Sequence, residues 1–131
     1  QEVIVVSAPE PTAIVDAYAV IKIILAEDSG KNVQVLINSV DRAEDAQEVF
    51  CQINSVVKRF LNREVEYLGH IERDSHVSQA VRSQTLVTHR FPNAMASRSF
   101  RNLARRMARQ EIAARPADGL VWEKLLNDWV N

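Results

Sequence analysis

The chain alternates between short apolar runs and longer segments in which apolar residues recur every three or four positions. The apolar runs are Glu2–Ser7 (EVIVVS), Val33–Ser39 (VQVLINS) and Glu64–Ile71 (EVEYLGHI). Continuous, β-branched runs of this kind are typical of strands that are covered on both faces of a parallel sheet. The pattern therefore predicts three strands, and it places Val3–Val6 in the interior of a sheet rather than at its margin.

The segments that follow the first two runs have helical periodicity. We expect the first helix to reach about Glu27, with Thr12 as its N-terminal cap and Gly30 as its stop. The second helix should extend from about Ala43 to Leu61, with Asp41 as its cap. The apolar stripes consist of Ile14, Val15, Tyr18, Ile21 and Leu25 in the first helix, and of Ala46, Val49, Phe50, Ile53, Val57, Phe60 and Leu61 in the second.

The chain after the third strand is mainly helical. Asp74 is placed to cap a short helix over Val77–Val81, and Leu86–Thr88 is predicted as a brief extended stretch. A basic helix follows Pro92 and runs to about Ala114. Strands that alternate with helices predict an α/β fold. We expect one domain over residues 1–114, with about three parallel strands and helices on both faces in a three-layer α/β/α arrangement.

A separate amphipathic helix is predicted at the end of the chain, within residues 117–131. Its polar side carries Glu123, Lys124, Asn127 and Asp128. The opposite face is apolar and consists of Leu120, Val121, Trp122, Leu125, Leu126, Trp129 and Val130. We expect this face to dock on protein or on a membrane surface, because it is too wide to remain in water. With one lysine in the segment, protein is favoured.

Charge is divided unevenly along the chain. Residues 1–74 contain 13 acidic and 7 basic side chains, whereas residues 75–131 contain 4 acidic and 9 basic ones, so net charges of −6 and +5 underlie the overall −1. Arg98, Arg101, Arg105 and Arg109 form a basic face, which either meets a negatively charged partner or is simply solvated. The 47% of hydrophobic residues excludes general disorder, and no apolar run reaches the ~20 residues of a membrane span.

Few residues indicate catalysis. The three glycines, Gly30, Gly69 and Gly119, do not form a phosphate-binding loop. The three histidines lack the paired spacing of a metal site, so no metal ligands are predicted. The single cysteine, Cys51, excludes an internal disulfide, fits a reducing compartment and is expected to be buried on the apolar side of the second helix.

Polar residues gather instead at the carboxyl ends of the predicted strands, where open parallel sheets bind their ligands. Three segments end there, namely 7–12, Asn38–Ser39 and 71–74. Asn38 closes an apolar strand, and its carboxamide can either read a base edge or bond its own backbone in a turn. The residues alone leave both roles open.

Several stretches resemble the C-terminal half of the flagellar number regulators, the FlhG or FleN family, which are MinD-like P-loop ATPases of the ParA/MinD group. The most family-specific stretch is Glu10–Lys22, and Leu68–Gln84 carries a pattern that MinD-like proteins share more widely. Together with VLINSV and FPNAMASRSFRNLARRM, they extend the resemblance over about residues 1–112. The resemblance implies part of a P-loop ATPase fold, in which ATP joins two subunits in a sandwich dimer and hydrolysis releases them.

The resemblance also implies which residues hold the nucleotide. Asn38 would recognise adenine, and the loop of Ile71, Glu72, Arg73 and Asp74 would flank the base, although the family usually has proline where Glu72 stands. The loop of Pro9, Glu10, Pro11 and Thr12 would lie near the nucleotide. By the family pattern, the Walker A lysine, the magnesium-binding hydroxyl and the switch aspartates would precede Gln1. ATP or ADP with Mg²⁺ is therefore expected as cofactor of the full-length family protein, with no catalytic residue and no tight nucleotide binding in this chain alone.

The partners implied by the resemblance are a missing N-terminal half or a second copy, a flagellar assembly GTPase or basal-body proteins, and a membrane surface. The expected location is the cytoplasm, with the last helix as a peripheral contact to the inner face of the cell membrane. Two other functions stay open. One is a non-enzymatic interaction module that docks through the basic helix and the Trp122/Trp129 helix. The other is half of a ParA-type DNA-segregation ATPase that uses the arginine face for nonspecific DNA; sequence-specific nucleic acid binding is not expected.

Overall fold

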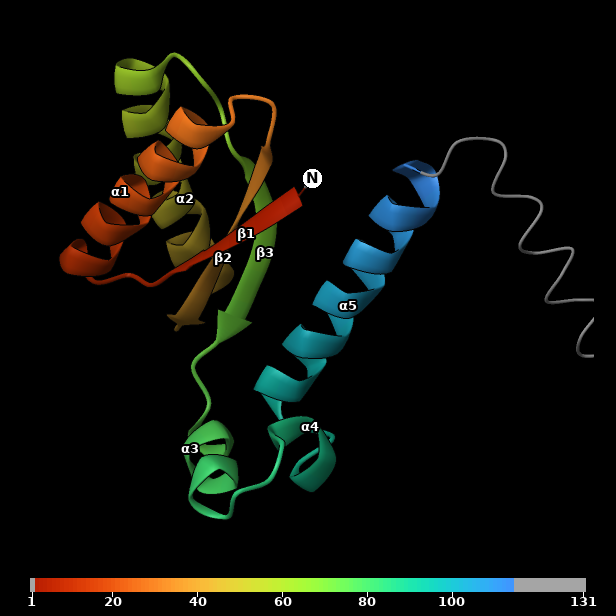
Figure 1. The fold of residues 1–131 in the computed structure, drawn as a ribbon. Helices are drawn as coiled ribbons and strands as arrows, with labels where there is room; N and C mark the ends of the chain where they lie inside the picture. The colour runs from red at the N-terminus through yellow and green to blue at the C-terminus, as the bar shows by residue number, and fades with distance from the viewer. Residues whose placement is uncertain (1, 115–131) are drawn as a thin grey trace, which may run out of the picture.

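The computed structural model describes residues 2–114, which form three strands and five helices (Figure 1). The strands are β1 (Glu2–Ser7), β2 (Asn32–Val40) and β3 (Glu66–Glu72). The helices are α1 (Pro11–Glu27), α2 (Ala43–Leu61), α3 (Ser75–Arg82), α4 (Val87–Arg90) and α5 (Met95–Ala114). All strand pairs are parallel and the sheet order is β1-β2-β3, which confirms the predicted α/β fold. The amphipathic helix predicted within 117–131 lies outside the described residues.

Helices cover both faces of the sheet, as predicted. Helix α1 packs against β1 and α2 against β2 on one face, while α5 packs against β3 on the other (Figure 1). Helices α3 and α4 lie beyond the carboxyl end of β3 (Figure 1). We call the face that carries α5 the far face.

The main core lies between the sheet and the α1/α2 layer. It consists of Val5, Ala17, Ile21, Val33, Val35, Ile37, Val40, Ala46, Val49, Ile53, Val57 and Val65. In β1, burial alternates with the two-residue period of a strand. Val5 is buried against the helices, whereas Ile4 and Val6 on the far face are 39% and 58% exposed. Within residues 2–114, the prediction that this strand is covered on both faces is therefore wrong, because α5 lies over β3 and leaves the far side of β1 open.

The start of α1 differs from the prediction. Pro11 occupies the first turn, where its fixed φ suits a helix and its missing N–H leaves no donor unpaired. Glu10 is the N-cap residue and makes no side-chain capping bond. Thr12 thus lies inside the helix and is not its cap. Helix α1 ends at Asp28, whose carboxylate accepts the Gly30 N–H at 2.9 Å, so the stop comes before Gly30.

Helix α2 also starts without the predicted cap. Arg42, not Asp41, is its N-cap residue, and no side chain caps the first turn. The acidic residues Glu44 and Asp45 lie in that turn, where their negative charge interacts favourably with the positive end of the helix dipole and stabilises the helix. Asp45 accepts the Arg42 guanidinium at 2.8 Å. In this helix, charge near the N-terminus replaces a side-chain cap.

Two further predictions are wrong. Cys51 is exposed on α2, because it stands two positions from both Val49 and Ile53, and a two-residue step rotates about 200° around a helix. Residues 87–88 are not extended, since they open α4. The contact that fixes α4 is distant in sequence, because the Ser97 hydroxyl donates to the Val87 carbonyl at 3.1 Å.

Candidate functional site

A β-bulge closes the carboxyl end of β2. Ile37 pairs with His70 and Val40 with Glu72, so two residues of β2 stand against one of β3. Ser39 adopts a φ of 59°, in the left-handed region, which accommodates the extra residue. Asn38 is exposed on the far face, and its carboxamide makes no hydrogen bond to any other described residue. The bulge thus presents both donors and the acceptor of Asn38 to solvent at the predicted ligand-binding end of the sheet.

Arg73 closes over this bulge. Its backbone N–H donates to the Val40 carbonyl at 2.7 Å, and its guanidinium lies 3.5 Å from the Ser39 carbonyl oxygen. The guanidinium also lies 3.4 Å from the Asp41 carboxylate, although both side chains are more than half exposed, so this ion pair is weak. The backbone of Arg73 therefore lies beside the end of β2, the strand that carries Asn38.

The other residues of the predicted base-flanking loop have different surroundings. Ile71 is 3% exposed, so its side chain belongs to the interior and only its backbone is available to a ligand. Glu72 is half-buried at the end of β3. The backbone at Ile71–Arg73 is held in place by β2, which gives this loop a defined position beside Asn38.

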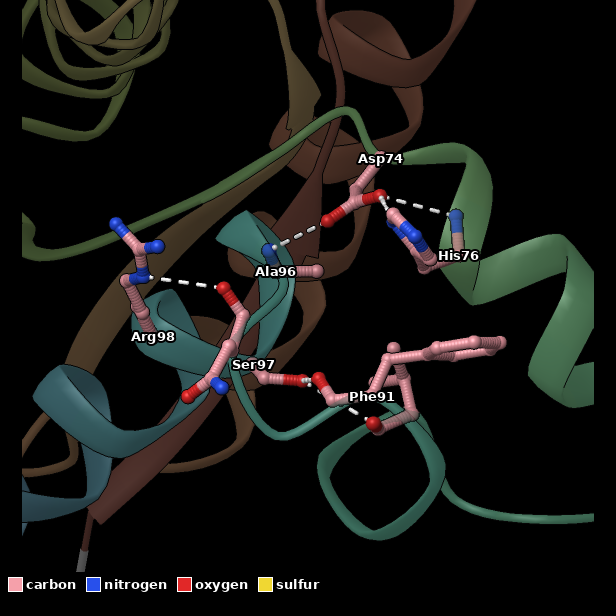
Figure 2. Close-up of polar contacts among 8 residues, drawn as sticks. Asp74, His76, Phe91, Ala96, Ser97 and Arg98 are labelled. Carbon is pink, nitrogen blue, oxygen red and sulfur yellow. Dashed lines mark hydrogen bonds and ion pairs between the residues drawn. The ribbon is translucent and has the colours of Figure 1, made fainter.

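Asp74 holds two helix N-termini with one buried carboxylate (Figure 2). It accepts the Ala96 N–H of α5 at 3.0 Å and the His76 N–H of α3 at 2.9 Å, and the His76 ring Nδ1 lies 2.7 Å away. The N–H bond from Ala96, followed by that from His76, holds the pKa of Asp74 at about 2. The prediction that Asp74 caps α3 is confirmed. Both of its carboxylate oxygens already accept hydrogen bonds from this chain. Its contribution to the candidate site is therefore to hold the backbone of the loop 71–74, which carries Arg73.

The Ser97 side chain joins α4 to α5 through hydrogen bonds that the sequence did not reveal. The buried Ser97 hydroxyl lies 2.7 Å from the Phe91 carbonyl oxygen in addition to its contact with Val87 (Figure 2). The Phe91 ring packs against the His76 imidazole at 4.6 Å between centroids. In the sequence, only the small residues at the start of α5 could have indicated this contact. Two of them, Ala96 and Ser97, are fully buried.

The β1–α1 loop lies at the same end of the sheet, because parallel strands end together. Ser7 is buried and donates its hydroxyl to the Ala13 carbonyl at 3.1 Å, which ties the loop to the first turn of α1. Pro9 is half-buried, whereas Glu10, Pro11 and Thr12 are exposed. Glu10 and Thr12 are therefore accessible from solvent beside β2.

The predicted basic face is present on α5. Arg98, Arg105 and Arg109 are exposed and Arg101 is half-buried. The contacts that these side chains make within the described residues go to neutral oxygens, namely the Asn93 carbonyl for Arg98 and the Asn102 side chain for Arg105. Arg106 differs from them, since its guanidinium donates to the Tyr67 carbonyl at 2.8 Å and anchors α5 to β3.

Metal and membrane features are sparse in this part of the chain. Residues 2–114 contain no group of three or more histidine, cysteine, aspartate or glutamate side chains that could hold a metal ion. None of the helices described is both long and apolar enough to cross a bilayer. The predicted partner or membrane segment with Leu120, Trp122 and Trp129 lies outside the described residues.

Two curated proteins are similar to this chain. It is 34% identical over 116 residues to the antiactivator FleN of Pseudomonas aeruginosa, a match that covers 88% of this chain and 41% of FleN. It is 33% identical over 104 residues to the flagellum site-determining protein YlxH of Helicobacter pylori, covering 78% of this chain and 34% of YlxH. No family model matches. The chain spans well under half the length of both relatives, and it belongs to the family of flagellar number regulators that FleN and YlxH represent.

Proposed function

We propose that this chain forms the adenine side of a nucleotide site in an ATP-dependent regulator of flagellar number or placement. The observation that carries the proposal is the free carboxamide of Asn38, displayed on a bulge where β2 ends and next to the Arg73 loop. A carboxamide offers a donor and an acceptor side by side, which matches the pattern on an adenine edge. The names of the two relatives, an antiactivator and a flagellum site-determining protein, support the flagellar part.

Each group at the site has a defined task in this proposal. Asn38 bonds the base edge, and the aliphatic part and guanidinium of Arg73 cover one face of the ring. Asp74 acts as a positioning residue, because it fixes the backbone that carries Arg73. When bound, ATP with Mg²⁺ supplies the reactive phosphate. In this proposal the described residues serve the recognition of the base.

The test is the Asn38→Ala variant of the complete natural protein. Loss of a base-edge partner should weaken ATP binding by about 1–3 kcal/mol, with an unchanged circular dichroism spectrum. Isothermal titration with ATP measures this directly. Gln52→Ala on α2, an exposed amide far from the site, is the matched control and should bind ATP like the wild type. Equal affinity of wild type and Asn38→Ala would remove Asn38 from the site.

The exposed arginines of α5 favour a second candidate, a protein-interaction module without nucleotide chemistry. The guanidinium groups of these arginines have no carboxylate partner in the described residues. They could therefore bind carboxylates on an acidic protein, such as a flagellar assembly GTPase or a basal-body component. Charge reversal of Arg105, tested against the purified flagellar partner, separates the two candidates. A pure interaction module would lose its partner and show no ATP binding in any variant.

A further inference from the structure

Helix α1 is mainly apolar around its whole circumference. Its inner side, with Ala17 and Ile21, is buried against β1 and α2. Its outer side also carries large apolar residues, because Val15 and Ile23 are 65% and 60% exposed and Val20 is 47% exposed. A helix that is apolar on all sides is usually buried on all sides. Within residues 2–114, nothing covers the outer side of α1.

The neighbouring helix α2 has the opposite character. The two helices pack side by side on the face of the sheet that lies opposite α5 (Figure 1). The exposed side of α2 is mainly polar, and it carries Glu44, Gln47, Glu48, Gln52, Lys58 and Arg59. The apolar outer side is therefore a property of α1 and not of the whole helical layer.

The residues on the outer side of α1 have a symmetric order. Steps of four place Val15, Ala19 and Ile23 in one row, and Ala19 is the central residue of the helix. Asp16 and Lys22 flank this row, each three residues from Ala19 and on opposite sides of it. Both are exposed, and neither forms an ion pair or a side-chain hydrogen bond with another residue in 2–114. We call Val15, Asp16, Ala19, Lys22 and Ile23 the α1 outer face.

A two-fold axis through Ala19 makes the α1 outer face complementary to itself. When a second α1 lies antiparallel on the first, residues at equal distances before and after Ala19 meet each other. Val15 then contacts Ile23 of the second copy, and Asp16 contacts Lys22 of the second copy. Each contact occurs twice, as in every two-fold interface. The small side chain of Ala19 allows the helix axes to approach to about 8 Å, the close end of the usual range.

Other arrangements lose this complementarity. A shift by one residue places Asp16 opposite Ile21 or Ile23 of the second copy, and a parallel pair brings like charges together at Asp16 and at Lys22. An unrelated protein would not require the symmetry. An anionic lipid surface attracts basic segments, whereas this face has one charge of each sign. Charge and symmetry together favour a second copy as the occupant.

We propose that the α1 outer face is an interface between two copies of this protein, in which the two helices pack antiparallel about Ala19. Two helices of this length bury less than the ~1,200 Å² of a standard stable interface, so the pairing is weak and requires a high protein concentration. In dilute unfolding experiments α1 is therefore unpaired. The contact involves no nucleotide, so this inference does not rest on the proposed function.

Charge exchange in the complete natural protein, without added nucleotide, tests the register. In sedimentation velocity, the wild type should shift from monomer to dimer as its concentration rises. Asp16→Lys and Lys22→Asp each replace both ion pairs by like-charge contacts, which should weaken self-association about tenfold. A mixture of the two variants has opposite charges at both contacts again, so it should dimerise like the wild type. Glu48→Lys is the matched control, since it makes the same charge change at an exposed position of α2.

A disulfide tests the position of the two-fold axis. Because Ala19 meets the same residue of the second copy, Ala19→Cys should form a covalent dimer when concentrated protein is oxidised with diamide. The wild type is the control, since its Cys51 is exposed on α2 and should give no covalent dimer.

Four results would overturn the proposal. A wild type that stays monomeric at every concentration would assign the α1 outer face to another segment of the natural protein or to a different partner. Association that needs phosphatidylglycerol vesicles would assign it to a membrane. A dimer that forms equally well in Asp16→Lys, or a wild-type dimer without cross-linking of Ala19→Cys, would place the contact elsewhere. Loss of ATP binding in Asn38→Ala would change none of these readings, so the two proposals fail separately.

Discussion

At the scale of single residues, Asp74 connects the site to the rest of the fold. Both of its oxygens accept backbone N–H groups from helix starts, one at Ala96 and one at His76. Capping by aspartate typically stabilises a helix start by ~1 kcal/mol, and here one carboxylate serves two starts. Because Arg73 is its neighbour in sequence, the geometry of the candidate site depends on these two bonds.

Asp74→Asn should lower the free energy of unfolding near neutral pH by about 1–3 kcal/mol, because an amide oxygen is a weaker acceptor than a carboxylate and the new NH₂ group faces one of the two backbone N–H donors. The pKa of Asp74 is about 2 in the folded protein against an ordinary 3.8. A depressed pKa stabilises the fold above the ordinary value, and that stabilisation is lost as the pH falls toward 2. The gap between wild type and variant should therefore narrow over this acidic range.

Urea unfolding at neutral and acidic pH measures this gap. Asp16→Asn on α1, which changes an exposed carboxylate, is the matched control and should leave the free energy of unfolding near its wild-type value. A gap for Asp74→Asn that stays constant down to pH 2 would contradict the assignment of its charge to the two helix starts.

At the scale of elements, the contact of α5 with β3 depends on Gly69. A bulge between β2 and β3 precedes this residue, and Gly69 has a φ of 152°, which side-chain-bearing residues rarely adopt. A Cβ here would lie 2.8 Å from the Leu103 Cδ1. Close approach and backbone conformation thus both require glycine, and they set how deeply α5 sits on the sheet.

Gly69→Ala should destabilise the chain by about 1–3 kcal/mol, as expected for a strained backbone. Combining it with Leu103→Ala separates the two causes, because this second change removes the contact and leaves the φ strain. We expect the double-mutant cycle to recover only part of the cost in chemical denaturation. Gly30→Ala is the control, since Gly30 has no positive φ and is exposed in a turn. A neutral Gly69→Ala variant would show that α5 moves freely on β3.

At the scale of the whole molecule, β1 is an edge strand within residues 2–114. Its outer backbone groups have no partner strand there. An open groove of about 400 Å³ runs along this edge between β1 and α1, lined by Val3, Ile4, Val5, Val6, Ala13, Asp16, Ala17, Val20 and Ile24. Uncharged, apolar strand edges tend to pair with another strand.

We expect β1 to be paired in solution, either with another segment of the natural protein or with a second copy. Burial of each large apolar side chain contributes about 1.5–3 kcal/mol, which makes an open edge costly for a domain of this size. Light scattering on dilute samples, together with hydrogen exchange of the amides of Val3–Val6, measures the pairing. A monodisperse monomer with those amides unprotected and the rest of the sheet intact would contradict this expectation.

The order of strands and helices can be read from the amino-acid sequence, because apolar periodicity reflects both the local backbone geometry and the side of each element that is buried. It predicted the three strands, the parallel sheet, α1, α2 and α5 to within a few residues, and the cap at Asp74. The resemblance to flagellar number regulators was also readable from local motifs. Asn38 was predicted as a candidate ligand-binding residue from its place at the end of a strand, and the bulge explains why its side chain faces solvent.

Contacts between segments that are distant along the chain are visible only in the three-dimensional fold. Ser97 holds Val87 and Phe91, which turns a stretch predicted as extended into α4. The caps predicted at Thr12 and Asp41 were wrong, since neither helix has a side-chain cap. Helix α1 starts with a proline, which has no N–H to satisfy, and α2 starts with acidic residues that interact favourably with the helix dipole. Exposure of Ile4 and Val6 follows from where α5 sits, and that position depends on Gly69 and Leu103. In each of these contacts the two partners are far apart along the chain, so the local pattern around one residue does not reveal the other.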